Sequence, residues 1–208
     1  MKIFPLRKTN RDESVVLAER ALRLEAEVGN LRSEVQELRE LVGHLDSERD
    51  LLLSGIERLR PGMRPPVLGE VMHGLVFRAF DLASFYLALV DWPNDLLEFP
   101  FYHEGGRARQ HPSRRLSELP GLTGKAIRAG RPLYTRTIEE AQAGGAVFTE
   151  AEKGSGLIPS TWYGVPLGIP QRPLGLVSFQ SFQADAFPEE RRRTLDAFAT
   201  LLTAALQG

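Results

Sequence analysis

The sequence has no cysteine among its 208 residues. This absence excludes disulfides, thiolate nucleophiles, cysteine-ligated zinc, iron–sulfur clusters and thioether-linked chromophores. An excess of one charge is also missing, because 26 Lys and Arg residues stand against 27 Asp and Glu residues. Proteins that neutralise many phosphates usually carry a basic excess, so we do not expect a nucleic-acid partner.

Long hydrophobic runs and a signal peptide are absent as well. The longest uncharged run, residues 154–171, contains three prolines and several glycines, and it cannot form a membrane span. The first ten residues lack the continuous apolar core of an export signal. We therefore expect a cytoplasmic protein that does not insert into a membrane.

Composition divides the chain into four segments: a short basic arm at 1–12, a leucine repeat at 13–60, a proline hinge at 61–66 and a globular domain at 67–207. The arm has only four basic residues and contains a proline. It is too short and too sparse to act as the DNA-reading part of a basic-region zipper. The hinge holds three prolines in six residues, which predicts the end of the preceding helix.

A leucine recurs every seven residues from Leu17 to Leu59. If these leucines occupy heptad position d, several a positions hold valine or isoleucine, a combination that favours a parallel two-stranded coiled coil. We predict a homodimer whose seam consists of Leu17, Leu24, Val28, Leu31, Val35, Leu38, Val42, Leu45, Leu52, Ile56 and Leu59.

The charged positions beside the seam also favour a parallel pair, in which each g residue faces the e residue five places on in the partner. Opposite charges meet in three successive pairs, Arg20 with Glu25, Glu27 with Arg32, and Glu34 with Arg39. The alternative is a long amphipathic helix packed on its own domain. At about 1.5 Å per residue, however, the repeat would extend far beyond a domain of this size.

The rest of the chain predicts alternating helices and strands. Periodicity and turn residues predict, in order, a helix at 67–80, strands at 83–92 and 96–103, a polar mobile loop at 105–117, a helix at 122–129, a strand at 133–136, strands at 161–169 and 174–182, and a closing helix with Pro188 in its first position.

Three motifs in this region carry a resemblance. Residues 121–133 hold a Gly-x-x-Gly helix followed by a Gly-x-Pro turn, Gly164–Leu167 precedes Leu174–Phe179 across a short turn, and Ala186–Glu190 leads into the closing helix. In order and spacing they resemble a GAF domain, a small-molecule sensor fold, over Pro66–Leu206. A PAS domain is the nearest competitor, and the closing helix favours GAF. The resemblance implies an α+β fold, with a central antiparallel sheet flanked by helices after the coiled coil.

The resemblance does not identify a ligand or a cofactor. GAF domains that bind cyclic nucleotides often carry an Asn-Lys pair and a later Phe-x-x-x-Asp-Glu, whereas this chain has only Phe148-Thr149-Glu150-Ala151-Glu152. Cyclic GMP is therefore not expected. Family members that attach a bilin through cysteine, or reduce methionine sulfoxide with cysteine, are excluded by the missing cysteines.

A ligand is expected between the sheet and the variable middle segment, where apolar walls meet polar tips. The candidate ligand-binding residues are Phe101, His103, Arg107, Arg109, Tyr134, Arg136, Trp162 and Tyr163. The arginines would suit an anionic group through bidentate hydrogen bonds. The alternative to ligand binding is a structural role, in which one of the two aromatic residues Trp162 and Tyr163 lies in the core and the arginines face solvent.

We expect a dimeric, non-enzymatic sensor or regulatory protein that binds a small molecule or a protein partner. The sequence ends at Gly208, just after the closing helix, so the response is expected to pass to a separate protein effector. One alternative is a scaffold whose GAF fold binds no small molecule. Another is a metal or haem site built from His103, Glu104 and His111, because imidazoles and a carboxylate suit such centres.

Overall fold

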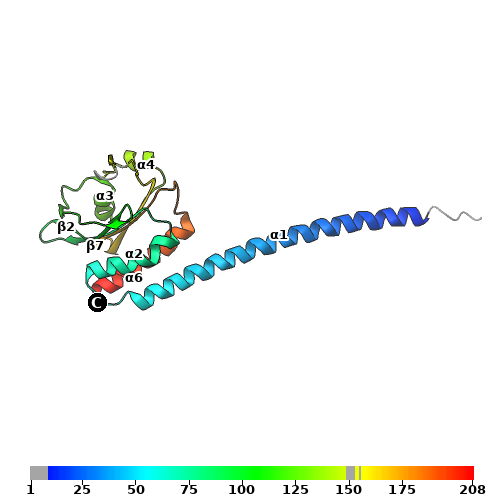
Figure 1. The fold of residues 1–208 in the computed structure, drawn as a ribbon, viewed down its shortest axis with the longest axis horizontal. Coiled ribbons are helices and arrows are strands. Elements are labelled where there is room, and N and C mark those ends of the chain that lie inside the picture. Colours follow the sequence, from blue (N-terminus) through cyan, green and yellow to red (C-terminus); the bar gives the residue numbers. More distant parts are fainter. Residues whose placement is uncertain (1–8, 149–152, 155) are drawn as a thin grey trace, which may run out of the picture. The chain divides into compact units, whose positions relative to one another are not determined.

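The computed structural model describes residues 9–148, 153–154 and 156–208 (Figure 1). Most of the predicted basic arm and residues 149–152 of the Phe148 motif lie outside these ranges. The chain divides into two compact units, Met1–Arg49 and Asp50–Gly208. No helix in the described ranges has the length and apolar character that crossing a membrane requires.

The elements follow the predicted order. They are α1 (Thr9–Arg58), α2 (Pro65–Ala79), β1 (Ser84–Asp91), β2 (Leu96–Glu104), β3 (Arg107–Ala108), β4 (Arg114–Arg115), α3 (Gly121–Ala129), β5 (Leu133–Thr135), α4 (Ile138–Ala143), β6 (Thr161–Ile169), β7 (Arg172–Ser181) and α6 (Glu189–Gln207).

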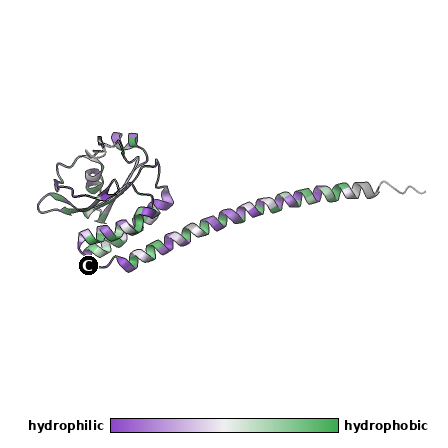
Figure 2. Cartoon of the chain, viewed as in Figure 1, coloured by the Kyte–Doolittle hydropathy of each residue, from purple (hydrophilic) through white to green (hydrophobic). Residues whose placement is uncertain are grey.

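Helix α1 confirms the long helix that the leucine repeat predicts. Within one chain the seam side chains from Leu17 to Leu45 are between 44% and 64% exposed. Figure 2 shows these hydrophobic positions interspersed with hydrophilic ones along the helix. The pairing of two such helices stays a prediction.

The last turns of α1 belong to the second unit. Leu59 is buried, Leu51 and Leu52 pack against the buried core of the domain, and Gly55 lies against the ring of Phe198 in α6. Two leucines of the predicted dimer seam, at 52 and 59, therefore contact the chain's own domain.

Helix α2 begins at Pro65, inside the segment predicted as a hinge. The first turn of a helix tolerates proline because its amide groups have no partner within the helix. The break between the helices is consequently short, running from the end of α1 at Arg58 to Pro65, with a turn at Gly62 (φ 79°).

The seven strands of the described residues form one antiparallel sheet in the order β3-β2-β1-β7-β6-β5, and β4 also pairs with β2. Helices α2 and α6 cover one face, and α3 and α4 lie on the other side (Figure 1). Successive side chains of a strand point to opposite faces, so each strand contributes to both layers.

A β-bulge interrupts the pairing of β1 with β2. Leu87 pairs with Phe101 and Leu89 pairs with Glu98, so Phe99 and Pro100 together oppose Ala88. Proline is tolerated at a bulge because the ladder there needs no amide donor. Beyond the bulge, side chains of β2 alternate in the opposite phase.

The two faces bury separate clusters. Phe85, Phe179, Phe187 and Phe198 are fully buried on the face of α2 and α6. The other face buries a smaller cluster that includes Ala88, Leu97, Leu122, Ala126, Ile127 and Leu176. The first face is therefore the main hydrophobic core.

Several sequence predictions need correction. The segment predicted as a mobile loop contains the short strands β3 and β4, and helix α4 was not predicted. Pro188 precedes α6 as its N-cap rather than opening it, because the helix begins at Glu189. Strand β6 has the predicted bounds, α1 begins four residues before the predicted repeat, and the ends of the other predicted elements agree to within two residues.

A histidine pair lies in the face covered by α2. The ring of His73 in α2 packs against that of His103 in β2, with centroids 4.0 Å apart and an interplanar angle of 39°, beside Phe77 and Phe101. His73 Nε2 and His103 Nδ1 are buried and have no hydrogen-bond partner among the described residues. Burial, and secondarily the charge of His103, lower the pKa of His73 to about 4. Burial also lowers the pKa of His103, although a hydrogen bond to the Gly106 backbone opposes this.

Gly69 and Gly74 of α2 provide a matched test of packing. A Cβ at Gly69 would lie 2.3 Å from Phe101 Cβ, whereas nothing lies within 4 Å of a Cβ at Gly74. We expect Gly69→Ala to lower the free energy of unfolding by about 1–3 kcal/mol. Gly74→Ala should raise it by about 0.5–1 kcal/mol through helix propensity alone. Urea denaturation measures both, and equal effects would contradict the close packing of α2 on β2.

The histidine pair predicts a pH dependence of stability. Because folding lowers the pKa of His73 from 6.5 to about 4, the unfolded chain binds more protons in that window, and the free energy of unfolding falls as pH is lowered through it. His73→Phe should reduce the loss of stability between pH 7.5 and pH 5, measured by urea denaturation. Identical pH dependence in His73→Phe and wild type would contradict this account.

Candidate functional site

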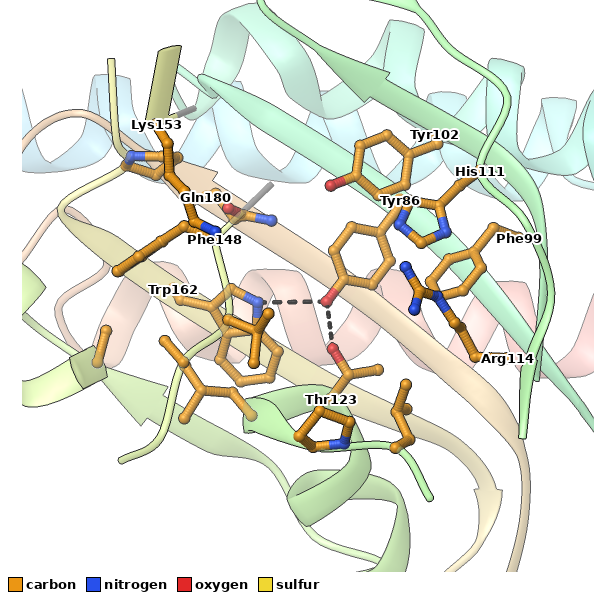
Figure 3. A pocket seen from close by; sticks show the side chains of 17 residues that line it. Tyr86, Phe99, Tyr102, His111, Arg114, Thr123, Phe148, Lys153, Trp162 and Gln180 are labelled. Carbon is orange, nitrogen blue, oxygen red and sulfur yellow. Dashed lines mark hydrogen bonds between the residues drawn. The ribbon is translucent and has the colours of Figure 1, made fainter. Parts of the chain in front are cut away.

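A cavity of about 320 Å³ lies between the sheet and the segments on its α3 side (Figure 3). Its walls are largely aromatic. The rings that line it belong to Tyr86, Phe99, Tyr102, His111, Phe148 and Trp162. This size is at the small end of ligand sites in proteins, and the wall chemistry is typical of them.

Hydrogen bonds join three elements at the wall of the cavity. Trp162 of β6 donates from Nε1 to the Tyr86 hydroxyl of β1 over 3.3 Å. That hydroxyl shares a 2.7 Å hydrogen bond with Oγ1 of Thr123 in α3. Figure 3 shows this chain crossing from the sheet to the helix. It satisfies polar atoms of two buried aromatic side chains and fixes the positions of their rings.

Gly164 makes room for the Trp162 ring. The two residues lie two positions apart on β6, on the same face of the sheet. A Cβ at Gly164 would lie 2.0 Å from the Trp162 Cη2 atom, so only glycine permits this placement. The Trp-x-Gly sequence thus positions the indole along the strand.

A row of rings forms a second wall. Tyr86 and Tyr102 stack with an interplanar angle of 2° and centroids 5.2 Å apart. His111 stacks on Tyr102 at 5.1 Å and contacts Phe99 at 4.3 Å. Its Nδ1 lies 3.0 Å from the Pro112 carbonyl oxygen, and a hydrogen bond there requires the proton on Nδ1 because a carbonyl oxygen only accepts. The β2 bulge brings Phe99 and Tyr102 to the same face although they are three residues apart.

The charged side chains that line the cavity within the described ranges are basic. Arg114 and Lys153 lie on opposite sides of it, with Gln180 nearer to the lysine (Figure 3). Among the lining residues within the described ranges, none is acidic. The site therefore combines apolar aromatic walls with positive charge.

Only one predicted site residue lines this cavity, and it is Trp162. Phe101 and His103 point to the opposite face, where they contact His73. The bulge reverses their direction, because a regular strand would place them with Phe99 on the cavity side.

The three predicted arginines also lie outside the cavity lining. Arg107 is exposed on β3, and Arg109 forms an ion pair with Glu104 at 3.4 Å. Arg136 donates from Nε to Glu140 over 2.9 Å. The last pair holds the pKa of Arg136 above and that of Glu140 below its usual value, chiefly through this hydrogen bond.

The predicted tyrosines tie the α6 side of the domain together. Tyr134 donates to Asp185 over 2.8 Å, and Tyr163 donates to Asp196 of α6 over 2.6 Å. Burial, followed by the bonded carboxylate, raises the pKa of Tyr134 to about 12 and raises that of Tyr163 further. Burial likewise raises the pKa of Asp196.

The predicted metal or haem site does not assemble. His103 belongs to the face of α2, whereas His111 contacts Phe99 and Tyr102 on the cavity face. In the described ranges, no three His, Asp or Glu side chains are grouped so that they could hold a metal ion. The sheet itself separates the two imidazoles that this hypothesis required.

Sequence reasoning missed most of the cavity residues. Tyr86 could have been found from the alternation of β1, because Phe85 and Leu87 beside it face the main core. Thr123 lies on the turn of α3 that also buries Leu122 and Ala126. Arg114 and Lys153 follow from no sequence pattern, since their placement depends on the segments that fold over the sheet.

The GAF domain family profile matches residues 67–207. Among solved structures, the chain is similar to the GAF domain of a phosphoenolpyruvate-protein phosphotransferase from Acinetobacter, with 19% identity, a TM-score of 0.56, and coverage of 78% of this chain and 91% of that one. It is also similar to the nlh2 GAF domain of A. aeolicus in an inactive state, with 15% identity, a TM-score of 0.61, and coverage of 78% and 96%.

A third similar structure is the free methionine-R-sulfoxide reductase of Neisseria meningitidis in complex with its substrate, with 17% identity, a TM-score of 0.54, and coverage of 68% of this chain and 76% of that one. The sequence has no significant match among curated proteins. At these identities the solved structures support the fold alone. Because the family profile covers well over half of the residues, this chain belongs to the GAF domain family.

Proposed function

We propose that this protein is a dimeric, cytoplasmic, non-enzymatic sensor whose GAF domain binds a small molecule and signals to a separate protein effector. The observation that carries the proposal is the cavity of about 320 Å³ with aromatic walls. Ligand sites are typically concave, mostly apolar and equipped with a few placed polar groups, and this cavity has that composition.

The absence of cysteine supports a binding role rather than a catalytic one. The similar reductase has an enzymatic name, but methionine sulfoxide reduction in this family is expected to need cysteine, and this chain has none. The most strongly perturbed pKa values belong to His73 and Tyr163, which face the opposite side of the sheet from the cavity. Both groups lie away from the cavity, His73 half-buried beside other rings and Tyr163 in the buried core, which favours structural roles for them.

The exposed seam of α1 supports dimerisation. Eight apolar side chains from Leu17 to Leu45 follow the heptad register and are each at least 44% exposed in a single chain. A second copy would bury them, and burial of apolar surface drives association. Three g-to-e charge pairs select the parallel orientation, although each exposed pair contributes only about 0.2–1 kcal/mol.

Filling the cavity should abolish ligand binding. Ala146 lines the cavity, whereas Ala143 is exposed on α4 outside it. We expect at least one compound of a metabolite panel to raise the melting temperature of the wild type. A ligand present at 100 times its Kd should add about 2.7 kcal/mol to the free energy of unfolding.

Ala146→Phe should lose this stabilisation, and the matched variant Ala143→Phe should keep it. Differential scanning fluorimetry measures all three proteins against the same panel. A panel without any stabilising compound, or a shift that Ala146→Phe retains, would contradict the sensor proposal and favour the ligand-free scaffold.

Charge in the seam should separate the dimer. We expect Leu31→Glu combined with Leu38→Glu to give a monomer, because burying unpaired carboxylates at d positions costs several kcal/mol. Leu22 is equally a leucine of α1, is 66% exposed and lies at heptad position b. Leu22→Glu should therefore remain dimeric. Sedimentation equilibrium at micromolar concentration measures the mass, and a monomeric wild type would contradict the proposal.

The missing cysteines allow a clean test of orientation. A single Ala21→Cys substitution places one thiol at an a position near one end of the seam. In a parallel, in-register pair the two thiols face each other and should form a disulfide on mild oxidation. An antiparallel pair would hold them far apart and give no cross-linked dimer on a non-reducing gel.

A further inference from the structure

The cavity has two kinds of wall that suit different parts of one ligand. On one side Tyr86, Tyr102 and His111 form a continuous stack, and Phe99 contacts the same histidine. Trp162 lines another part of the wall, held by its hydrogen bond to Tyr86. Flat π faces favour a planar aromatic guest through stacking or edge contacts.

Arg114 is placed at this aromatic wall by backbone pairing. It lies on β4, where it pairs with Leu97 of β2, and the neighbouring Leu116 amide donates to the Asp95 carbonyl over 3.0 Å. Ser117 also donates its amide to the Asp95 carboxylate over 3.0 Å. The segment carrying Arg114 is thus anchored to the start of β2.

The Arg114 guanidinium is available to a ligand. Within the described ranges it has no hydrogen-bond or ion-pair partner, although it lines the cavity. A guanidinium presents parallel donors that match carboxylate and phosphate oxygens in a bidentate geometry. Lys153 lines the other side of the cavity (Figure 3).

We propose that the cavity binds a planar aromatic anion, a system of one or two fused rings that carries a carboxylate or a phosphate. The rings lie against the stacked aromatic wall and the anionic group meets Arg114. The volume of about 320 Å³ suits a molecule of this size. This inference rests on the proposed function, because it names the ligand class of the same cavity.

Three naphthalene compounds with the same rings and different head groups test the proposal. Isothermal titration of the full chain would compare 2-naphthoate, 2-naphthyl phosphate and the uncharged 2-naphthamide, with acetate as an anion without rings. We expect at least one naphthyl anion to bind ten times more tightly than the amide, a difference of about 1.4 kcal/mol. Acetate should not bind.

Two arginine variants separate a specific contact from general charge. Arg114→Gln should lose at least tenfold in affinity for the preferred anion and little for the amide. Arg115→Gln removes the same charge from the next residue of β4, which does not line the cavity, and should bind like the wild type. Circular dichroism melts confirm that both variants are folded.

Each outcome decides the inference. The naphthyl anion that binds with the higher affinity identifies the head group as carboxylate or phosphate. Equal affinity for anion and amide, equal loss in both arginine variants, or no binding of any naphthyl compound would overturn it. If the wild type binds a neutral compound of the metabolite panel instead, and Ala146→Phe does not bind it, the proposed ligand class is wrong. The proposal of a small-molecule sensor would then still hold.

Discussion

The extra residue that β2 carries opposite Ala88 determines which side chains reach each face of the sheet. Before the bulge Leu97 and Phe99 lie on the cavity side of the sheet, and after it Tyr102 does. Phe101 and His103 lie on the side covered by α2. The stacked wall of Tyr86, Tyr102 and His111 depends on this change of phase. Deleting one residue at the bulge would move the side chains that follow it on β2 to the opposite face of the sheet, because strand side chains alternate with a period of two.

The two faces of the sheet differ in how much apolar surface they bury. The face under α2 and α6 holds the fully buried phenylalanines and the histidine pair, so it supplies most of the apolar burial that stabilises the domain. The other face is covered by short helices and connecting segments, and a cavity remains among its rings.

The order of the elements was predictable because helices and strands have distinct apolar periods, and the strand at 161–169 has the predicted bounds. The cavity was predictable only in part. Trp162 followed from its strand, but the phase of Tyr102 depends on a bulge whose sequence signal, Pro100, does not specify which residue is extra. Arg114 reaches the cavity through a two-residue strand, which is too short to give a periodic signal.

The last turns of α1 pack beside α6, so part of the row of leucines is committed to the domain. Leu52 and Leu59 continue the heptad register of the seam, yet they pack within their own domain. A zipper that extended past Arg49 would have to withdraw these leucines from the neighbourhood of Phe198. A coiled coil extended in this way would remove apolar contacts beside α6 in each domain. Stable packing beside α6 would in turn limit the length of the coiled coil. In the proposed dimer, the length of the coiled coil and the packing of each domain would therefore compete for the same two side chains.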